Sequence, residues 1–126
     1  MAVQGPLVIL VVDDDPFVRE STATILGALS YDVVDAGSGD DAVALARAGR
    51  AIDVALVDFH MPGGLDGLET VRALRQIRPD LPFVLVTGDH AETIRFDGDL
   101  AGGVALGKPY RMADLRNTLQ RLLAAG

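Results

Sequence analysis

The sequence of 126 residues contains no cysteine, so disulfide bonds and thiolate metal sites are both excluded. Lysine is nearly absent, because Lys108 is the only lysine among eleven basic residues. The net charge of −7 argues against direct nucleic-acid binding, which requires basic patches. No secretory signal pattern is present, and no apolar run is long enough to span a bilayer. We therefore expect a cytoplasmic protein without membrane contact.

What the chain does contain is a regular alternation of apolar runs and helical periodicity. Its length suits about one domain, which we place at residues 1–126. Continuous apolar runs rich in β-branched residues are typical of strands that are buried on both faces. The expected strands are residues 7–12, 31–36, 51–57, 83–87 and 103–107.

Helix starts are marked between these runs. Asp15 followed by Pro16 is typical of a first helical turn, and Ser38 with Asp41 three residues later resembles an N-cap. Further helices are expected from apolar spacing at 68–77 and 112–122. The arginines of the helix at 68–77 should lie largely on its solvent-facing side; they are Arg72, Arg75 and Arg78.

A helix is also expected in the segment 91–102, but its signal is poor. Gly98 and Gly102 each disfavour a helix interior by about 1 kcal/mol, so we expect a short or irregular helix. Alternating strands and helices predict an α/β fold, a doubly wound parallel sheet with helices on both faces. Ligands in such folds bind beyond the carboxyl ends of the strands.

Polar residues gather at these carboxyl ends. Asp13 and Asp14 follow the first strand, and Asp58 ends the third. Thr87 and Lys108 stand at the ends of the fourth and fifth. Each has an ordinary explanation alone, as a cap or a turn residue. Their convergence on one edge predicts a functional site.

The charges at this edge favour a metal ion. Two carboxylates about 4 Å apart repel by roughly 4 kcal/mol at an effective dielectric near 20. Asp13, Asp14 and Asp58 would therefore need a cation or raised pKa values. An all-oxygen site without cysteine suits Mg2+ or Mn2+ better than Zn2+.

At this point the sequence resembles the receiver domain of two-component response regulators along nearly its whole length. The matching motifs are Val11-Val12-Asp13-Asp14, Val57-Asp58 with Met61-Pro62, Val86-Thr87-Gly88 and Lys108-Pro109. The resemblance implies a flavodoxin-like sheet of five strands in the order 2-1-3-4-5. It also implies a cis peptide between Lys108 and Pro109.

The resemblance assigns roles to the acidic residues. Asp58 would accept a phosphoryl group from a phosphohistidine. Asp13, Asp14, Asp58 and the backbone carbonyl of His60 would hold Mg2+ as the cofactor. The implied partners are a sensor histidine kinase or a histidine phosphotransfer protein, and a downstream protein target. Such a domain catalyses only its own phosphorylation and dephosphorylation, and is not an enzyme in the usual sense.

Further positions are implied to act on the phosphoryl group. Thr87 would donate its hydroxyl to it, and Lys108 would pair with its oxygens, in keeping with the charge neutralisation that phosphoryl transfer needs. His60 and Asp89, two positions beyond Asp58 and Thr87, would tune dephosphorylation by controlling the approach of water.

The sequence departs from the family pattern at the output side. Many receivers carry an aromatic residue at the position of Ala105, and the loop 61–67 is one residue longer than usual. A phosphorylation-independent protein-binding module, a pseudo-receiver, is therefore the alternative. A small aspartyl hydrolase lacks support, because His60 occupies the position of the second acid. A flavin site would need a hydroxyl- and glycine-rich loop after the first strand, where this loop is acidic.

Overall fold

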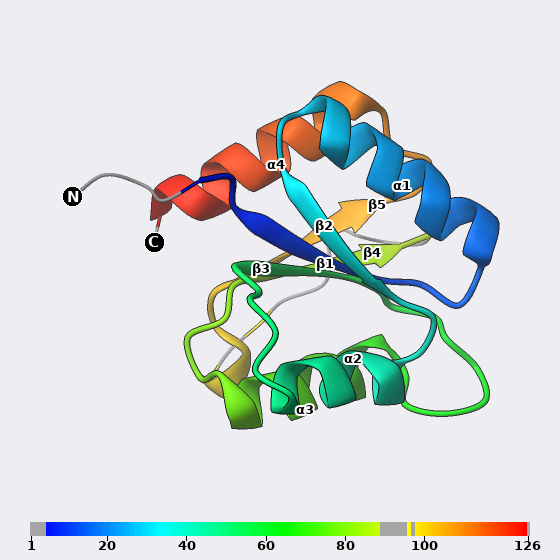
Figure 1. Ribbon diagram of the computed structural model, residues 1–126, viewed down its shortest axis with the longest axis vertical. Helices are drawn as coiled ribbons and strands as arrows, with labels where there is room; N and C mark the ends of the chain where they lie inside the picture. The colour runs from blue at the N-terminus through cyan, green and yellow to red at the C-terminus, as the bar shows by residue number, and fades with distance from the viewer. Residues whose placement is uncertain (1–4, 89–95, 97, 126) are drawn as a thin grey trace.

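The computed structural model describes residues 5–88, 96 and 98–125, and these form a parallel sheet between two layers of helices (Figure 1). The five strands are β1 (Val8–Val12), β2 (Asp32–Ala36), β3 (Val54–Asp58), β4 (Phe83–Thr87) and β5 (Gly103–Gly107). Their order is β2-β1-β3-β4-β5, and every neighbouring pair is parallel. The predicted flavodoxin-like topology is therefore confirmed.

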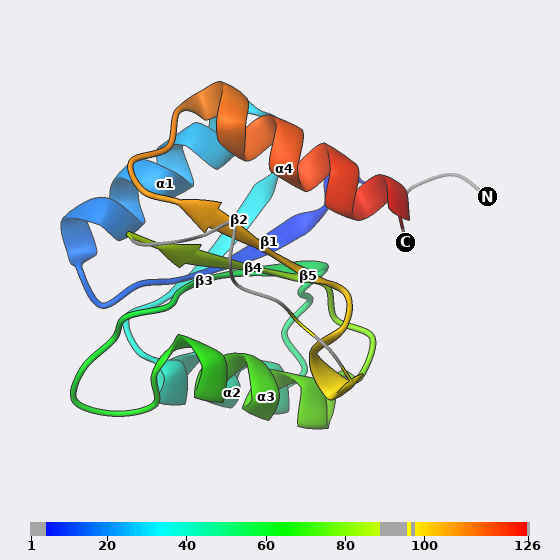
Figure 2. The ribbon, with the colours of Figure 1, turned by 180° about the vertical axis from the view of Figure 1, so that it is seen from behind.

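Within the part of the chain that the structure describes, two α-helices cover each face of the sheet. They are α1 (Pro16–Ala28), α2 (Gly39–Arg47), α3 (Gly67–Ile77) and α4 (Met112–Ala125). Figures 1 and 2 show α1 and α4 on one face and α2 and α3 on the other. None of the helices in the described ranges combines the length and the apolar character that crossing a bilayer requires.

The expected helix at 91–102 falls largely outside the described residues. Near the end of this segment, the described residues form a 3-10 helix, η2 (Gly98–Leu100). Gly98 opens this turn with a φ of 62°, a value that side-chain-bearing residues rarely adopt.

The predicted helix starts are confirmed. The carboxylate of Asp15 accepts hydrogen bonds from the backbone N–H groups of Phe17 and Val18, and Pro16 occupies the first turn. The hydroxyl of Ser38 accepts from Asp41 N at 3.0 Å. Each side chain satisfies donors that the first turn of a helix leaves unpaired.

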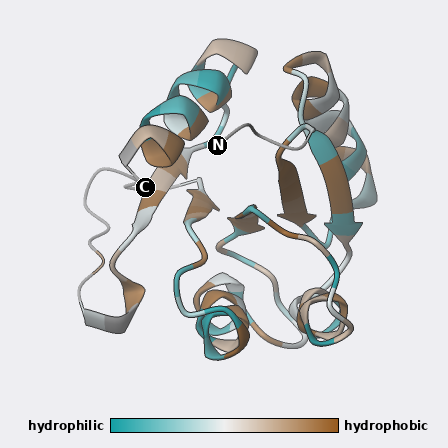
Figure 3. Ribbon diagram, turned by 60° about the vertical axis from the view of Figure 1, so that its left-hand side comes forward, coloured by the Kyte–Doolittle hydropathy of each residue, from teal (hydrophilic) through white to brown (hydrophobic). Residues whose placement is uncertain are grey.

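Alternating side chains of the strands build a separate apolar core on each face. Leu10 and Val12 of β1 face the core under α2 and α3, whereas Ile9 and Val11 face the core under α1 and α4. Because both faces are covered, the central strands are apolar up to their carboxyl ends, and Figure 3 shows them mostly in brown. This burial supports the sheet whose carboxyl ends carry the site.

Four strand boundaries differ from the sequence prediction: three strands begin later than expected, and β3 ends at Asp58 rather than at Val57. β1 begins one residue late, at Val8, and β3 begins at Val54, because the Asp53 carboxylate accepts from Val8 N at 2.7 Å. β2 begins at Asp32, since the N–H of Tyr31 donates instead to Leu26 O at the end of α1. A side chain and a helix end thus take donors that a longer strand would have used.

The exposure of the α3 arginines and of the C-cap residue Arg78 also differs from the prediction. Arg72 is exposed as expected, but Arg75 and Arg78 are half-buried. Arg75 donates to Leu81 O at 2.9 Å and to Ala101 O at 2.5 Å. Arg78 donates to Ala46 O in the last turn of α2 and to Arg50 O in the loop that follows. Long side chains cover apolar surface with their stems while their guanidinium groups bind neighbouring loops.

Candidate functional site

Three carboxylates come together at the carboxyl ends of β1 and β3. Asp13, Asp14 and Asp58 each place one oxygen within 4.8 Å of the others. Asp13 and Asp58 are buried, at 6% and 8% exposure, and Asp14 is exposed. The pairing of Val12 with Val57 in adjacent strands brings the following residues, Asp13 and Asp58, side by side.

Asp13 is held by hydrogen bonds to its backbone and to its carboxylate. Its N–H donates to Ala36 O at 3.2 Å, and its Oδ1 accepts from Asp15 N at 2.9 Å. Burial raises the pKa of Asp13, and the charge of nearby Asp58 acts in the same direction. The hydrogen bond from Asp15 opposes this rise in pKa. The ionised form of Asp13 therefore lacks a full counter-charge, which a cation would supply.

Lys108 reaches this cluster from the far side of the sheet. Its Nζ lies 3.3 Å from Asp58 Oδ1, so the ammonium crosses from the end of β5 to the end of β3. Its backbone N–H donates to Thr87 O at 2.8 Å and extends the β4–β5 pairing. The peptide between Lys108 and Pro109 is cis, as the resemblance implied. Thr87 is buried at the end of β4.

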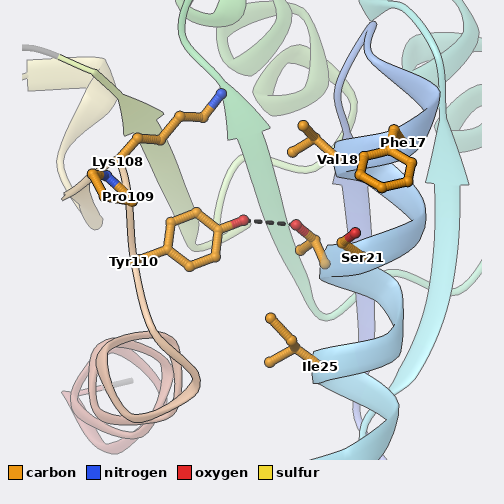
Figure 4. A pocket seen from close by; sticks show the side chains of 8 residues that line it. Phe17, Val18, Ser21, Ile25, Lys108, Pro109 and Tyr110 are labelled. Atoms are coloured by element: carbon orange, nitrogen blue, oxygen red, sulfur yellow. Dashed lines mark hydrogen bonds between the residues drawn. The ribbon is translucent and has the colours of Figure 1, made fainter.

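Tyr110, two residues beyond Lys108, was not singled out from the sequence. Its hydroxyl lies 2.7 Å from Thr22 Oγ1, so it connects the loop after β5 to α1 (Figure 4). In this view the Lys108 side chain extends away from the tyrosine ring. Residues of α1 and the segment 108–110 line an apolar hollow of about 510 Å³, in which Phe17 is 79% exposed. The sequence signal that could have drawn attention to Tyr110 is an aromatic residue directly after Lys108-Pro109.

Gly67 is a second site residue that the sequence analysis missed. A Cβ at this position would lie 2.4 Å from Asp58 O and 2.5 Å from Phe59 Cα. Its N–H donates to Phe59 O at 3.0 Å, so the start of α3 packs directly on the end of β3. Asp66 and Glu69 form a reciprocal capping box there. The sequence signal that could have drawn attention to Gly67 is the pair Asp66-Gly67 at the start of an amphipathic helix.

The loop 61–67, which the resemblance implies is one residue longer than usual, turns at a glycine. Gly63 has a φ of 91°, which favours a residue without a side chain, while Met61 is buried in the core. His60 is exposed, two residues beyond Asp58. Asp89 lies outside the described residues. Ala105 is half-buried on β5 and lines a hollow of about 460 Å³ between β5 and α4.

The donor set fits a hard divalent cation. The cluster offers carboxylate oxygens from three residues and, among the described residues, no histidine or thiolate joins it. Mg2+ prefers such oxygen ligands and keeps several waters, which the exposed Asp14 side permits. The adjacent ammonium of Lys108 would serve a second anionic group rather than the metal.

Comparisons with known proteins agree with this geometry. The family model described as "Response regulator receiver domain" matches residues 9–120. The probable transcriptional regulatory protein TcrX of Mycobacterium tuberculosis is 34% identical over 119 residues, which cover 94% of this chain and 50% of that protein. This chain thus spans about half the length of that curated relative.

Solved structures share the fold. The Vibrio cholerae chemotaxis protein CheY4 is 30% identical with a TM-score of 0.81, covering 94% of this chain and 99% of that one. The Thermotoga maritima response regulator TrrA, solved in complex with Mg2+ and BeF, is 26% identical with a TM-score of 0.79. That match covers 92% of this chain and 98% of TrrA.

Proposed function

Because the chain belongs to the response regulator receiver family, we propose that it accepts a phosphoryl group on Asp58 in a two-component phosphorelay. The observation that carries this assignment is the position of the Asp58 carboxylate. At the end of a central strand, it lies within 4.8 Å of two further carboxylates and 3.3 Å from an ammonium group. The response regulator receiver is a signalling module, and the roles of its individual residues here are our proposal.

Mg2+ is the cofactor that the acidic cluster fits. Asp13, Asp14 and Asp58 would hold the ion together with the backbone carbonyl of His60. When bound, the ion supplies positive charge for the oxygens of the transferred group. The TrrA structure, which was solved in complex with Mg2+ and BeF, supports this choice.

The transfer itself needs one nucleophile and several positioned donors. A carboxylate oxygen of Asp58 attacks phosphorus in line, the P–N bond to the donor imidazole breaks, and the imidazole leaves with the bonding electron pair. Lys108 pairs with a phosphoryl oxygen through its ammonium group, and Thr87 donates its hydroxyl to another. Attack of water on phosphorus later releases inorganic phosphate and restores the carboxylate. The domain thus catalyses its own phosphorylation and dephosphorylation.

The implied partners follow from this chemistry. The phosphoryl donor is a sensor histidine kinase or a histidine phosphotransfer protein, and a downstream protein target reads the phosphorylated state. We propose that residues 1–126 act as one receiver domain in the cytoplasm. With a net charge of −7, this domain makes no direct contact with nucleic acid.

The acceptor is tested by incubating the protein with acetyl phosphate and Mg2+, then measuring its intact mass. We expect one added phosphoryl group in the wild type and none in Asp58→Asn. Asp32→Asn is the matched control, because Asp32 is an exposed aspartate at the opposite end of the sheet, and it should be labelled like the wild type. Labelling of the Asp58→Asn variant at the wild-type level would contradict the assignment. A wild type that binds Mg2+ and is never labelled would point to a pseudo-receiver.

A further inference from the structure

Arg19, in the first turn of α1, reaches back to the end of β1. One guanidinium nitrogen, Nη1, donates to Asp13 O at 2.8 Å, and Nε donates to Asp35 Oδ2 at 3.0 Å. Asp35 lies in β2, the neighbour of β1. A single side chain therefore joins α1, β1 and β2 at the residue where the acidic cluster begins.

The hydrogen bond from Arg19 acts on the peptide group between the two metal-site aspartates. The carbonyl of Asp13 belongs to the peptide plane that joins Asp13 to Asp14. The direction in which both side chains leave the backbone depends on this plane. Asp13 N donates to Ala36 O, and Asp13 Oδ1 accepts from Asp15 N. The hydrogen bond from Arg19 adds a partner for the backbone carbonyl of Asp13.

The charge of Arg19 would have the opposite effect on a bound cation. A guanidinium near the cluster repels Mg2+, so a residue acting only through its charge would weaken binding. The ion pair with Asp35 offsets this charge at 3.0 Å. The positional effect and the charge effect of Arg19 therefore predict changes of opposite sign when the side chain is removed.

We propose that Arg19 is a positioning residue for the metal site, holding the Asp13–Asp14 peptide so that both carboxylates face Asp58. The proposal rests on the function proposed above, since it assigns the acidic cluster to Mg2+. Asp35 takes part by aiming the guanidinium and by neutralising it. Removing a group that orients a metal ligand typically weakens metal binding by about tenfold or more.

Gly37 offers an independent way to move the same guanidinium. A Cβ at Gly37 would lie 3.2 Å from Arg19 Nη1, closer than an ordinary contact. The backbone of Gly37 lies outside the left-handed region, so alanine is compatible with its conformation. Gly37→Ala should therefore displace the Arg19 guanidinium while leaving its charge unchanged.

The test is a titration of the full chain with MgCl2, followed through the backbone amide NMR signals of residues 13–15. Arg19→Met, which removes both the hydrogen bond and the charge, should raise the Kd for Mg2+ by about tenfold. Arg19→Lys keeps the charge but not the two-armed geometry, and should raise the Kd to a smaller extent. Gly37→Ala should shift the Kd in the same direction.

Arg47→Met is the matched control, because Arg47 is an exposed arginine on α2 and the charge change is identical. Its Kd should be equal to the wild-type value or slightly lower. Acetyl phosphate labelling adds a second readout. In the Arg19 variants the Mg2+ concentration for half-maximal labelling should rise, whereas the rate at saturating Mg2+ stays close to that of the wild type.

An unchanged or lower Kd in Arg19→Met would overturn the positioning role. If that variant fails to fold, unchanged Kd values in Arg19→Lys and Gly37→Ala would overturn it equally. Asp14→Ala separates this failure from failure of the proposed function. If Asp14→Ala binds Mg2+ like the wild type, the acidic cluster is not the metal site and both proposals fall.

Discussion

The hydroxyl groups of Thr22 and Tyr110 lie 2.7 Å apart, and this hydrogen bond connects α1 to the loop that carries Lys108 (Figure 4). Removing either hydroxyl takes away the partner of the other. Because Thr22 is buried, water has little access to replace that partner. The contact anchors the chain two residues beyond the ammonium that faces Asp58. It is a long-range link, 88 residues apart in sequence, that stabilises the loop from outside the site.

We predict that Thr22→Val and Tyr110→Phe each lower the free energy of unfolding by about 1 kcal/mol, since each removes a hydroxyl and little volume. Because both variants remove the same hydrogen bond, the double variant should lose less than the sum of the two. Urea denaturation of the four proteins measures this coupling. Strictly additive losses would show that the hydrogen bond adds nothing to stability.

Lys108→Gln should destabilise the protein most when Mg2+ is absent. Without metal, the ammonium of Lys108 pairs with the Asp58 carboxylate, with Nζ 3.3 Å from Oδ1. Its loss leaves the buried Asp58 beside Asp13 with less compensation. Thermal unfolding with and without saturating Mg2+ should show a larger drop in Tm for the metal-free protein. Equal drops in both conditions would contradict this reading.

Asp13→Asn should raise stability in the absence of Mg2+ and lower it in its presence. Asparagine keeps an oxygen that can accept a hydrogen bond from Asp15 N, but it removes the buried negative charge of Asp13. Burial disfavours that charge, as the raised pKa of Asp13 shows. When Mg2+ is present, its binding stabilises the folded wild type more than it stabilises the variant. The check is a Tm for each protein at zero and at saturating Mg2+. A variant less stable than the wild type in both conditions would refute the prediction.

Gly67→Ala should destabilise the protein by about 1–3 kcal/mol, the cost typical of forcing extra atoms into a packed interior. The added Cβ would meet backbone atoms of Asp58 and Phe59, which cannot rotate away as a side chain can. Gly27→Ala is the control, because Gly27 lies within α1 with nothing near its Cβ position. That substitution should stabilise the helix by up to about 1 kcal/mol. Chemical denaturation of both variants provides the comparison.

His60→Gly should shorten the lifetime of the phosphorylated protein. The imidazole is exposed two residues beyond Asp58, where its bulk can obstruct the water that attacks the phosphoryl group. The measurement is the dephosphorylation rate of the labelled variant and the labelled wild type at the same Mg2+ concentration. A rate equal to or slower than the wild-type rate would show that His60 does not obstruct hydrolysis.

Much of the fold was predictable because its signals are local. The apolar run of β1 and the caps at Asp15 and Ser38 depend on neighbours a few residues away. The edge of the sheet where Asp13 and Asp58 meet follows from the parallel topology, which alternation of strands and helices predicts.

The order of the strands came from family resemblance rather than from periodicity. The start of β3 was misplaced because Asp53 donates its N–H to Val8 and accepts from it, a contact across 45 residues. The burial of Arg75 was missed for the same reason, since its partner Ala101 lies on a distant loop. Neither contact leaves a pattern in the surrounding residues.

The sequence by itself determined which chemistry is available at the site, because residue type decides it. Three aspartates and one lysine, with no cysteine in the chain, specify an oxygen-ligand site with one ammonium. Only the tertiary structure decided what holds those groups in place. Arg19 reaches the Asp13 carbonyl, Tyr110 reaches Thr22, and Gly67 lets a helix approach Asp58, because chain folding brings together groups that sequence order keeps apart.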